Sequence, residues 1–229
     1  MLERPLAEKM RPNSLDEIIG HDKITGKDGI LRKIINSKKP TSLIFWGPAG
    51  IGKTTLARIL ANELNANFIE LSAVTAKKQD VIDVIKQARI NWNLNIRTVL
   101  FVDEIHRFNK AQQDSFLPHV ESGLITLIGA TTENPSFEVI PPLLSRARVI
   151  VLDKLKNEDL EKIIENAYKK AKEKNKKIKI NEEAIALMAD LASGDARVAL
   201  GNLELILNLN SNITKETVLK TLQKKLPRY

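Results

Sequence analysis

The chain has 229 residues, 43% of them apolar and 28% charged, which suits a globular protein of two domains and excludes an intrinsically disordered one. It contains no cysteine, which excludes a disulfide framework and a cysteine-ligated metal site. The net charge of +8 favours polyphosphate partners. Residues 1–12 lack the apolar segment of a signal peptide, and no apolar run approaches the roughly 20 residues of a membrane span. We therefore expect a cytoplasmic protein with no membrane partner.

Short apolar runs bounded by turn residues alternate with helical patterns as far as residue 152. We predict strands in these runs at Ser42–Trp46, Phe68–Leu71, Thr98–Val102, Ile125–Ile128 and Val149–Leu152. Helices are expected between them at Thr54–Leu64, Gln79–Ile90 and Ala111–Val120. Continuously apolar strands separated by helices predict an α/β fold, in which a parallel five-stranded sheet lies between layers of helices.

The strand signal ends after Leu152, and the rest of the chain carries helical patterns. We predict helices over Asn157–Lys174, Glu182–Ala192 with Asn181 as its N-cap, Arg197–Asn208 and Thr214–Leu226. This change predicts a boundary near Asp153, with an α/β domain over residues 1–153 and a small all-helical domain over residues 154–229.

A run of seven lysines lies between Lys169 and Lys179. A solvated helix end and the loop after it explain such a run, and a surface that binds nucleic-acid phosphates is the alternative. Charge alone does not distinguish the two.

The segment Gly47–Thr54 reads GPAGIGKT and fits the pattern G-x-x-x-x-G-K-[ST]. It directly follows a predicted strand and opens a predicted helix, which is the context of a phosphate loop, whereas a glycine-rich turn that matches by chance needs neither. Glycines allow a tight turn whose backbone N–H groups point at the β- and γ-phosphates of ATP, and the helix N-terminus adds a positive dipole end. Lys53 would place its charge on the terminal phosphates, and the Thr54 hydroxyl would bind Mg²⁺. The expected ATP-binding residues are Gly47, Pro48, Ala49, Gly50, Ile51, Gly52, Lys53, Thr54 and Thr55.

A second motif, VLFVDE, is an apolar strand that ends in Asp103 and Glu104. A buried strand that delivers Asp103 beside the phosphate loop would hold Mg²⁺. Glu104 would then orient or deprotonate the attacking water. Two carboxylates at the start of a solvated loop are the alternative, but a complete phosphate loop upstream favours the catalytic interpretation.

The stretch Asp103–Pro135 reads DEIHRFNKAQQDSFLPHVESGLITLIGATTENP. Together with GPAGIGKTT, the opening LAEKMRPNSLDEIIGH and the segment LLSRARV, it resembles the replication-associated recombination protein A family, whose eukaryotic relatives are the Werner-helicase-interacting ATPases. The family stands beside the clamp loaders and the Holliday-junction branch-migration motors among AAA+ ATPases. The resemblance extends over essentially the whole chain and implies an AAA+ P-loop NTPase fold with a nucleotide-binding domain followed by a helical lid domain.

The resemblance also implies catalytic roles by matching position. Thr132 resembles the first sensor, which contacts the γ-phosphate or the attacking water, and Asn134 competes for that role. Arg146 is similar to the arginine finger that reaches the ATP of a neighbouring subunit, and Arg197 to the second, ATP-contacting sensor of the lid. The alternatives are a turn hydroxyl for Thr132, a surface arginine for Arg146, and a helix-start residue paired with Asp195 for Arg197.

Two further segments take their interpretation from the same resemblance. Arg11-Pro12 and Ile18-Ile19-Gly20 resemble the segment that closes over the adenine. His106 follows the acidic pair, but the three histidines are dispersed, so we interpret it as structural or DNA-facing rather than as a metal ligand.

The chain departs from the family pattern in two places. It carries Ala49 and Ile51 where the family usually has proline and threonine, and since neither change removes a backbone N–H, ATP binding should survive. The family continues past residue 229 with a helical oligomerisation domain, so we expect homo-oligomerisation through the AAA+ interface to be weakened.

The resemblance implies Mg²⁺-dependent ATP hydrolysis coupled to replication-fork maintenance, recombination and repair of DNA. Forked, gapped or single-stranded DNA is the expected partner, with single-strand-binding protein or other replisome components as further candidates at the nucleoid. A clamp-loader or branch-migration ATPase is one alternative. A nucleotide-binding scaffold that does not hydrolyse ATP is another, although such subunits tend to lose the loop lysine, the acidic pair or the finger, and all three are present here.

Overall fold

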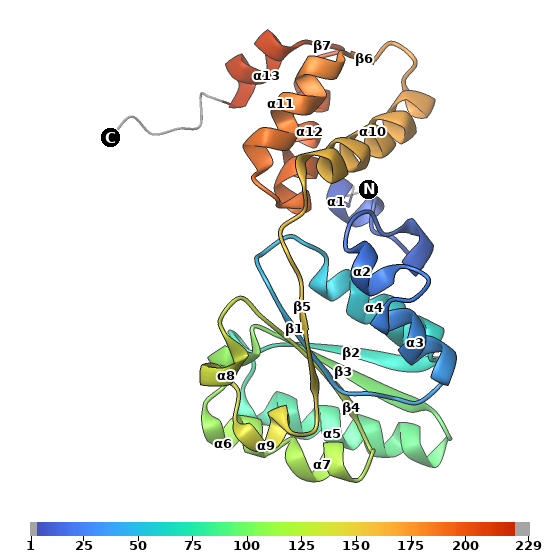
Figure 1. Ribbon diagram of the computed structural model, residues 1–229, viewed down its shortest axis with the longest axis vertical. Helices are drawn as coiled ribbons and strands as arrows, with labels where there is room; N and C mark the ends of the chain where they lie inside the picture. Colours follow the sequence, from blue (N-terminus) through green and yellow to red (C-terminus); the bar gives the residue numbers. More distant parts are fainter. Residues whose placement is uncertain (1–3, 223–229) are drawn as a thin grey trace. The chain divides into compact units, whose positions relative to one another are not determined.

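The computed structural model describes residues 4–222, which form two compact units (Figure 1). The α/β unit comprises residues 12–153, and the helical unit comprises residues 4–11 together with residues 154–222. The sequence placed residues 1–11 with the α/β domain, so the two divisions differ at the N-terminus. Within the described residues, no helix combines the length and the apolar character that crossing a membrane requires.

A five-stranded parallel sheet forms the centre of the α/β unit and confirms the predicted fold class. Its strands are β1 (Leu43–Trp46), β2 (Ala66–Ser72), β3 (Arg97–Asp103), β4 (Thr126–Thr131) and β5 (Arg148–Val151). They lie in the order β2-β3-β4-β1-β5. The central strand β4 is buried along its whole length, whereas the edge strand β5 is largely exposed.

Strands β2 and β3 extend beyond the apolar runs that predicted them. They pair from Ala66 opposite Arg97 to Ser72 opposite Asp103. The strands were predicted from runs of apolar residues, and a polar residue at a strand end does not belong to such a run. The predicted third strand therefore ends at Val102, one residue before Asp103. The extension makes Asp103 the last residue of the ladder and fixes its place at the carboxyl edge of the sheet.

Helices cover both faces of this sheet (Figure 1). They are η1 (Leu15–Glu17), α2 (Asp22–Thr25), α3 (Ile30–Ser37), α4 (Lys53–Glu63), α5 (Lys78–Asn93), η2 (Ile105–Arg107), α6 (Lys110–Asp114), α7 (Leu117–Glu121), α8 (Pro135–Glu138) and α9 (Pro141–Leu144). Helices α3 and α4 share a core with Phe45 and Phe101, and α5 shares the opposite core with Ile44 and Leu100. Successive strand residues point to opposite faces, so neighbours in the sequence serve different cores.

The single helix predicted over 111–120 is two short helices, α6 and α7. Pro118 has no N–H to continue the hydrogen bonding of the first helix, so the chain turns at Ser115 and α7 starts anew. The start of α6 is fixed by a capping box, in which the Gln112 N–H donates to Asn109 Oδ1 at 2.9 Å and the Asn109 N–H donates to Gln112 Oε1 at 3.0 Å.

The helical unit consists of short and long helices and one small ladder. Its elements are α1 (Leu6–Lys9), α10 (Asn157–Lys174), β6 (Lys179–Ile180), α11 (Glu182–Ala192), α12 (Ala196–Leu209), β7 (Asn212–Ile213) and α13 (Lys215–Leu222). The sequence does not predict β6 and β7, because a strand of two residues is too short to show the alternation of apolar and polar side chains that indicates a strand. The end of the predicted helix Thr214–Leu226 lies outside the described residues. Apolar side chains of α10, α11 and α12 form one core.

Helix α1 joins the helical unit through contacts that are distant in sequence. Leu6 and Met10 pack against the core of this unit. The Leu6 N–H donates to Glu204 Oε1 at 2.9 Å. A partner 198 residues away leaves no local pattern in the sequence, which explains why residues 4–11 were predicted in the other domain.

Candidate functional site

The predicted phosphate loop, Gly47–Thr54, joins the end of β1 to the start of α4. Its glycines are required by the backbone: φ is 68° at Gly50 and 104° at Gly52, left-handed values that side chains rarely adopt. At Gly47 the reason is close contact, since a Cβ there would lie 2.2 Å from the carbonyl oxygen of Leu152. The glycine spacing of the motif is therefore a consequence of the shape of the loop.

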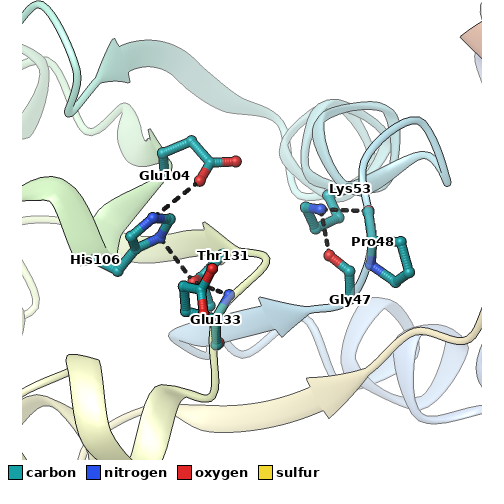
Figure 2. A network of polar contacts seen from close by, with 7 residues as sticks. All are labelled: Gly47, Pro48, Lys53, Glu104, His106, Thr131 and Glu133. Atoms are coloured by element: carbon teal, nitrogen blue, oxygen red, sulfur yellow. Dashed lines mark hydrogen bonds and ion pairs between the residues drawn. The ribbon is translucent and has the colours of Figure 1, made fainter. Parts of the chain in front are cut away.

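Lys53 is the first residue of α4 and turns its ammonium back toward the loop (Figure 2). Its Nζ donates to the carbonyl oxygens of Gly47 at 2.7 Å and Pro48 at 2.6 Å. The residue is only 7% exposed, and a buried ammonium requires such oxygen partners. The loop thus curves around a positive charge at the N-terminus of a helix, an arrangement that attracts phosphate.

The predicted adenine segment reaches the phosphate loop through a histidine that sequence reasoning did not single out. Pro12 begins the α/β unit, and Ile18 packs against one of its cores. Ile19 is half-buried. His21, two residues further on, has a left-handed backbone, and its Nε2 lies 3.0 Å from the carbonyl oxygen of Ile51 in the loop. In the sequence, His21 stood out only as the last residue of the matching segment LAEKMRPNSLDEIIGH.

The carboxyl ends of β1, β3 and β4 meet beside the phosphate loop. Trp46 pairs with Thr131 in the register of β1 and β4. The residue after β1, Gly47, donates its N–H to the Thr131 carbonyl oxygen at 3.1 Å. Asp103 ends β3 and is half-buried. The fold therefore brings Asp103, Thr131 and the loop to one edge of the sheet.

The donor set at this edge suits Mg²⁺. It offers the carboxylate of Asp103 and the hydroxyl of Thr54, both half-buried. In the described part of the chain, no three histidine, cysteine, aspartate or glutamate side chains come together as a metal cage. Mg²⁺ is usually bound by one or two protein oxygens together with substrate phosphates and water. Thr54 and Asp103 are thus residues that could hold it with a nucleotide.

Glu104 is part of a polar network that includes His106 and Thr131 (Figure 2). The Oε2 atom of Glu104 lies 3.3 Å from Nε2 of His106. The ring's Nδ1 lies 2.9 Å from Oγ1 of Thr131, which also accepts the Glu133 N–H at 3.0 Å. Thr131 is fully buried. The sequence did not identify Thr131 and left His106 with a structural or DNA-facing role, because nothing local indicates that residues 25 apart will meet.

The two residues considered for the first sensor follow β4 directly. Thr132 is exposed at the carboxyl edge of the sheet. Asn134 uses its side chain as the cap of α8, where Oδ1 accepts the Ser136 N–H at 3.0 Å. Thr132 therefore has the more available side chain, and its role as a sensor stays a prediction.

Arg146 lies at the opposite edge of the sheet from the phosphate loop of the same chain. It precedes β5, whose first residue, Arg148, pairs with Leu43 at the start of β1. The loop follows the other end of β1, where Trp46 pairs with Val151. Because β1 and β5 are parallel, the length of both strands separates the start of β5 from the loop.

Two predicted nucleotide ligands belong to the helical unit. Arg11 is half-buried and pairs with Glu8, one helical turn earlier. Arg197 is exposed in the first turn of α12. The carboxylate of Asp195 caps that helix by accepting the Val198 N–H at 2.9 Å.

Sequence comparison identifies matches to both units. Residues 43–155 match the ATPase family associated with various cellular activities (AAA), and residues 173–229 match an AAA C-terminal domain. The chain is 45% identical over 207 residues to Replication-associated recombination protein A of Haemophilus influenzae, which covers 90% of this chain and 46% of that protein. The Escherichia coli protein of the same name is 46% identical over 208 residues, with the same coverage. The chain thus spans about half the length of these relatives.

A protein of another name and a solved structure extend the likeness. ATPase WRNIP1 of Dictyostelium discoideum is 44% identical over 207 residues, which cover 90% of this chain and 24% of that protein. Among solved structures, the Thermotoga maritima RuvB Holliday junction branch migration motor matches with a TM-score of 0.78 and 30% identity, over 94% of this chain and 72% of that chain.

Proposed function

Because this chain belongs to the replication-associated recombination protein A family of AAA ATPases, we propose that it binds ATP with Mg²⁺ and hydrolyses it to ADP and phosphate. The observation that carries the proposal is the buried Lys53 ammonium inside the phosphate loop, at the sheet edge that also holds Asp103 and Glu104. Together they supply the charge that binds phosphate and the carboxylates that the hydrolysis of ATP requires.

The chemistry is in-line attack of water on the γ-phosphorus, with cleavage of the bond to the β–γ bridging oxygen. Loop N–H groups and Lys53 hold the phosphates, and the Lys53 ammonium exchanges its loop carbonyl partners for phosphate oxygens. Thr54 and Asp103 would hold Mg²⁺, which would supply positive charge to offset that of the phosphates. Glu104 orients the water and accepts its proton, while Thr132 contacts the γ-phosphate or the water as the first sensor.

Arg146 acts on the ATP of a partner subunit rather than on its own. The support is its place at the amino edge of the sheet, away from its own phosphate loop. A homo-oligomer that brings this edge against the loop of the next copy would complete the site. An arginine supplied in this way is typically worth about 10³–10⁵ in rate, so an isolated subunit should be slow.

Hydrolysis drives work on replicating DNA, as the names of the bacterial relatives suggest. Forked, gapped or single-stranded DNA is the proposed substrate, with single-strand-binding protein or other replisome components as partners in the cytoplasm, at the nucleoid. The helical unit serves as the lid, with Arg197 as its second sensor and Arg11, Pro12 and Ile19 in the adenine-binding segment. The likeness to RuvB favours a second candidate, a motor for branch migration.

The deciding experiment measures ATP hydrolysis against protein concentration with Mg²⁺, alone and with forked, single-stranded or four-way junction DNA. We expect hydrolysis that rises more than linearly with protein and increases with forked or single-stranded DNA. Lys53→Ala should abolish it, whereas Lys33→Ala, at an exposed position on α3, should not. Hydrolysis no greater than that of Lys53→Ala refutes the ATPase, and stimulation by four-way junctions alone favours the second candidate.

A further inference from the structure

The ring of His106 is held on both sides, between the carboxylate of Glu104 and the hydroxyl of Thr131 (Figure 2). The His106 side chain is only 8% exposed. Its two nitrogens contact residues of different segments: Glu104 follows β3, and Thr131 ends β4. The ring thus links the predicted water-orienting carboxylate to a fixed point of the sheet.

The chemistry of the groups determines which ring nitrogen carries hydrogen. A carboxylate offers no hydrogen, so Nε2 of His106, which contacts Glu104 Oε2 at 3.3 Å, carries the hydrogen on that side. In a neutral ring Nδ1 then carries no hydrogen, so the Thr131 hydroxyl directs its single hydrogen to Nδ1 at 2.9 Å rather than to the Glu133 carbonyl oxygen, which lies farther away at 3.3 Å. The Thr131 oxygen in turn accepts the Glu133 N–H at 3.0 Å. Every member of this chain has a partner, and the chain ends at the backbone that follows β4.

The Glu104 carboxylate depends on the His106 ring for its orientation, because its own backbone and side chain leave it free to rotate. Its backbone is left-handed, with φ of 54°, at the turn between β3 and η2. The side chain is half-buried and has three rotatable bonds. A carboxylate that moves among rotamers spends less time where it can orient water, and a misplacement of about 1 Å can cost a catalytic step about 100-fold.

We propose that His106 is a positioning residue for ATP hydrolysis: with Thr131 behind it, the ring holds the Glu104 carboxylate in the orientation that directs the attacking water. The proposal rests on the proposed ATPase function and adds a residue to it. It assigns the ring to the catalytic step and not to nucleotide binding, since its contacts are to Glu104 and Thr131 and not to the phosphate loop.

Steady-state kinetics of His106 variants test this assignment, once the wild type has been shown to hydrolyse ATP faster than Lys53→Ala. We expect His106→Ala to lower kcat by about 10- to 100-fold with little change in KM or in the affinity for ADP. His106→Gln, which retains an N–H donor near the position of Nε2, should recover part of the loss. His119→Ala removes a half-buried histidine of α7 outside the network and should leave kcat unchanged.

A double-mutant cycle separates positioning from general damage to the fold. If the ring acts through Glu104, His106→Ala should lower the residual rate of Glu104→Gln no further. Thr131→Val, which removes the hydroxyl behind the ring, should give a smaller loss of kcat in the same direction. If His106→Ala does not fold, His106→Gln and Thr131→Val carry the same test.

Nuclear magnetic resonance of the ring nitrogens provides a readout that does not depend on hydrolysis. The chain has three histidines, so signals can be assigned with His106→Gln. We expect the Nε2-protonated tautomer for His106, and Glu104→Gln should shift its ring signals while those of His21 and His119 stay in place. An unchanged or raised kcat in His106→Ala, additive losses in the cycle, or ring signals that ignore Glu104→Gln would overturn the proposal. A wild type no faster than Lys53→Ala removes the ATPase function first, and this proposal with it.

Discussion

Arg146 forms an ion pair with Glu121 at the end of α7, with 2.5 Å between Nη2 and Oε1. Its Nη1 also donates to the Pro142 carbonyl oxygen at 2.8 Å and to Ser145 Oγ at 2.9 Å. The guanidinium is therefore held by groups of its own chain. Both side chains of the pair are substantially exposed, 39% and 49%, so the pair is worth no more than about 1 kcal/mol. A phosphate of a neighbouring ATP could replace a partner that is held so weakly.

Glu121→Gln should release Arg146 from this pair. In the wild type, the guanidinium of Arg146 must leave Glu121 before it can contact the phosphate of a neighbouring ATP, and this costs about 1 kcal/mol. The variant lacks this cost. If Arg146 acts on a neighbouring ATP, Glu121→Gln should therefore hydrolyse ATP up to about fivefold faster at protein concentrations below full assembly. Glu63→Gln, at an exposed position of α4, is the matched control and should match the wild type. A rate equal to or below that of the wild type would show that Glu121 does not restrain Arg146.

Two inactive variants, Lys53→Ala and Arg146→Ala, should restore activity to one another when mixed. Lys53→Ala keeps its arginine but binds nucleotide poorly, whereas Arg146→Ala binds ATP and offers no arginine. An interface between the ATP of Arg146→Ala and the arginine of Lys53→Ala contains both parts of the site. The rate of the mixture is measured at a concentration at which the wild type self-associates. An inactive mixture there would contradict action between subunits.

Glu104→Gln should bind ATP with wild-type affinity and hydrolyse it about 10²–10⁴-fold more slowly in a single turnover, because the amide cannot accept the proton of water. Asp103 and Thr54 are unchanged, so the variant should still depend on Mg²⁺ for tight binding. Glu133→Gln is the matched control, since Glu133 joins the network only through its backbone N–H and carbonyl oxygen. An unchanged single-turnover rate would remove Glu104 from the catalytic step.

Gln113→Leu should lower the free energy of unfolding by about 3 kcal/mol. The Gln113 side chain is buried and bonds three backbone groups: its Nε2 donates to the carbonyl oxygens of Phe108 and Glu138, and its Oε1 accepts the Ile140 N–H, each at 3.0 Å. Leucine leaves all three groups without this partner, and an unsatisfied buried group costs about 1–3 kcal/mol. Denaturant unfolding measures the loss, with the exposed Gln79→Leu as control. A loss below about 1 kcal/mol would show that these groups find other partners.

The predictable parts of this structure are those set by residues close together in sequence. The phosphate loop was predictable because strand, glycines and helix start are consecutive, and Asp103 because a buried strand leads directly to it. Thr131 could not be distinguished from Thr132 by pattern, since which of them faces the core depends on the register of β4 against β1. The pairing of Glu121 with Arg146 likewise depends on how α7 and the turn after α9 pack together, and no repeating pattern of neighbouring residues indicates that contact.

The absence of a side chain at Gly47 leaves room for the carbonyl group of Leu152, the residue that follows β5. The Leu152 N–H donates to the Trp46 carbonyl oxygen at 2.8 Å, and its own carbonyl oxygen occupies the space where a Cβ of Gly47 would lie. Two residues later the chain enters the helical unit. The start of the loop therefore lies directly against the residue that leads out of the α/β unit, and any atom added at Gly47 would have to displace that residue. Substitution of Gly47 by alanine would impose such a displacement permanently, with no nucleotide present.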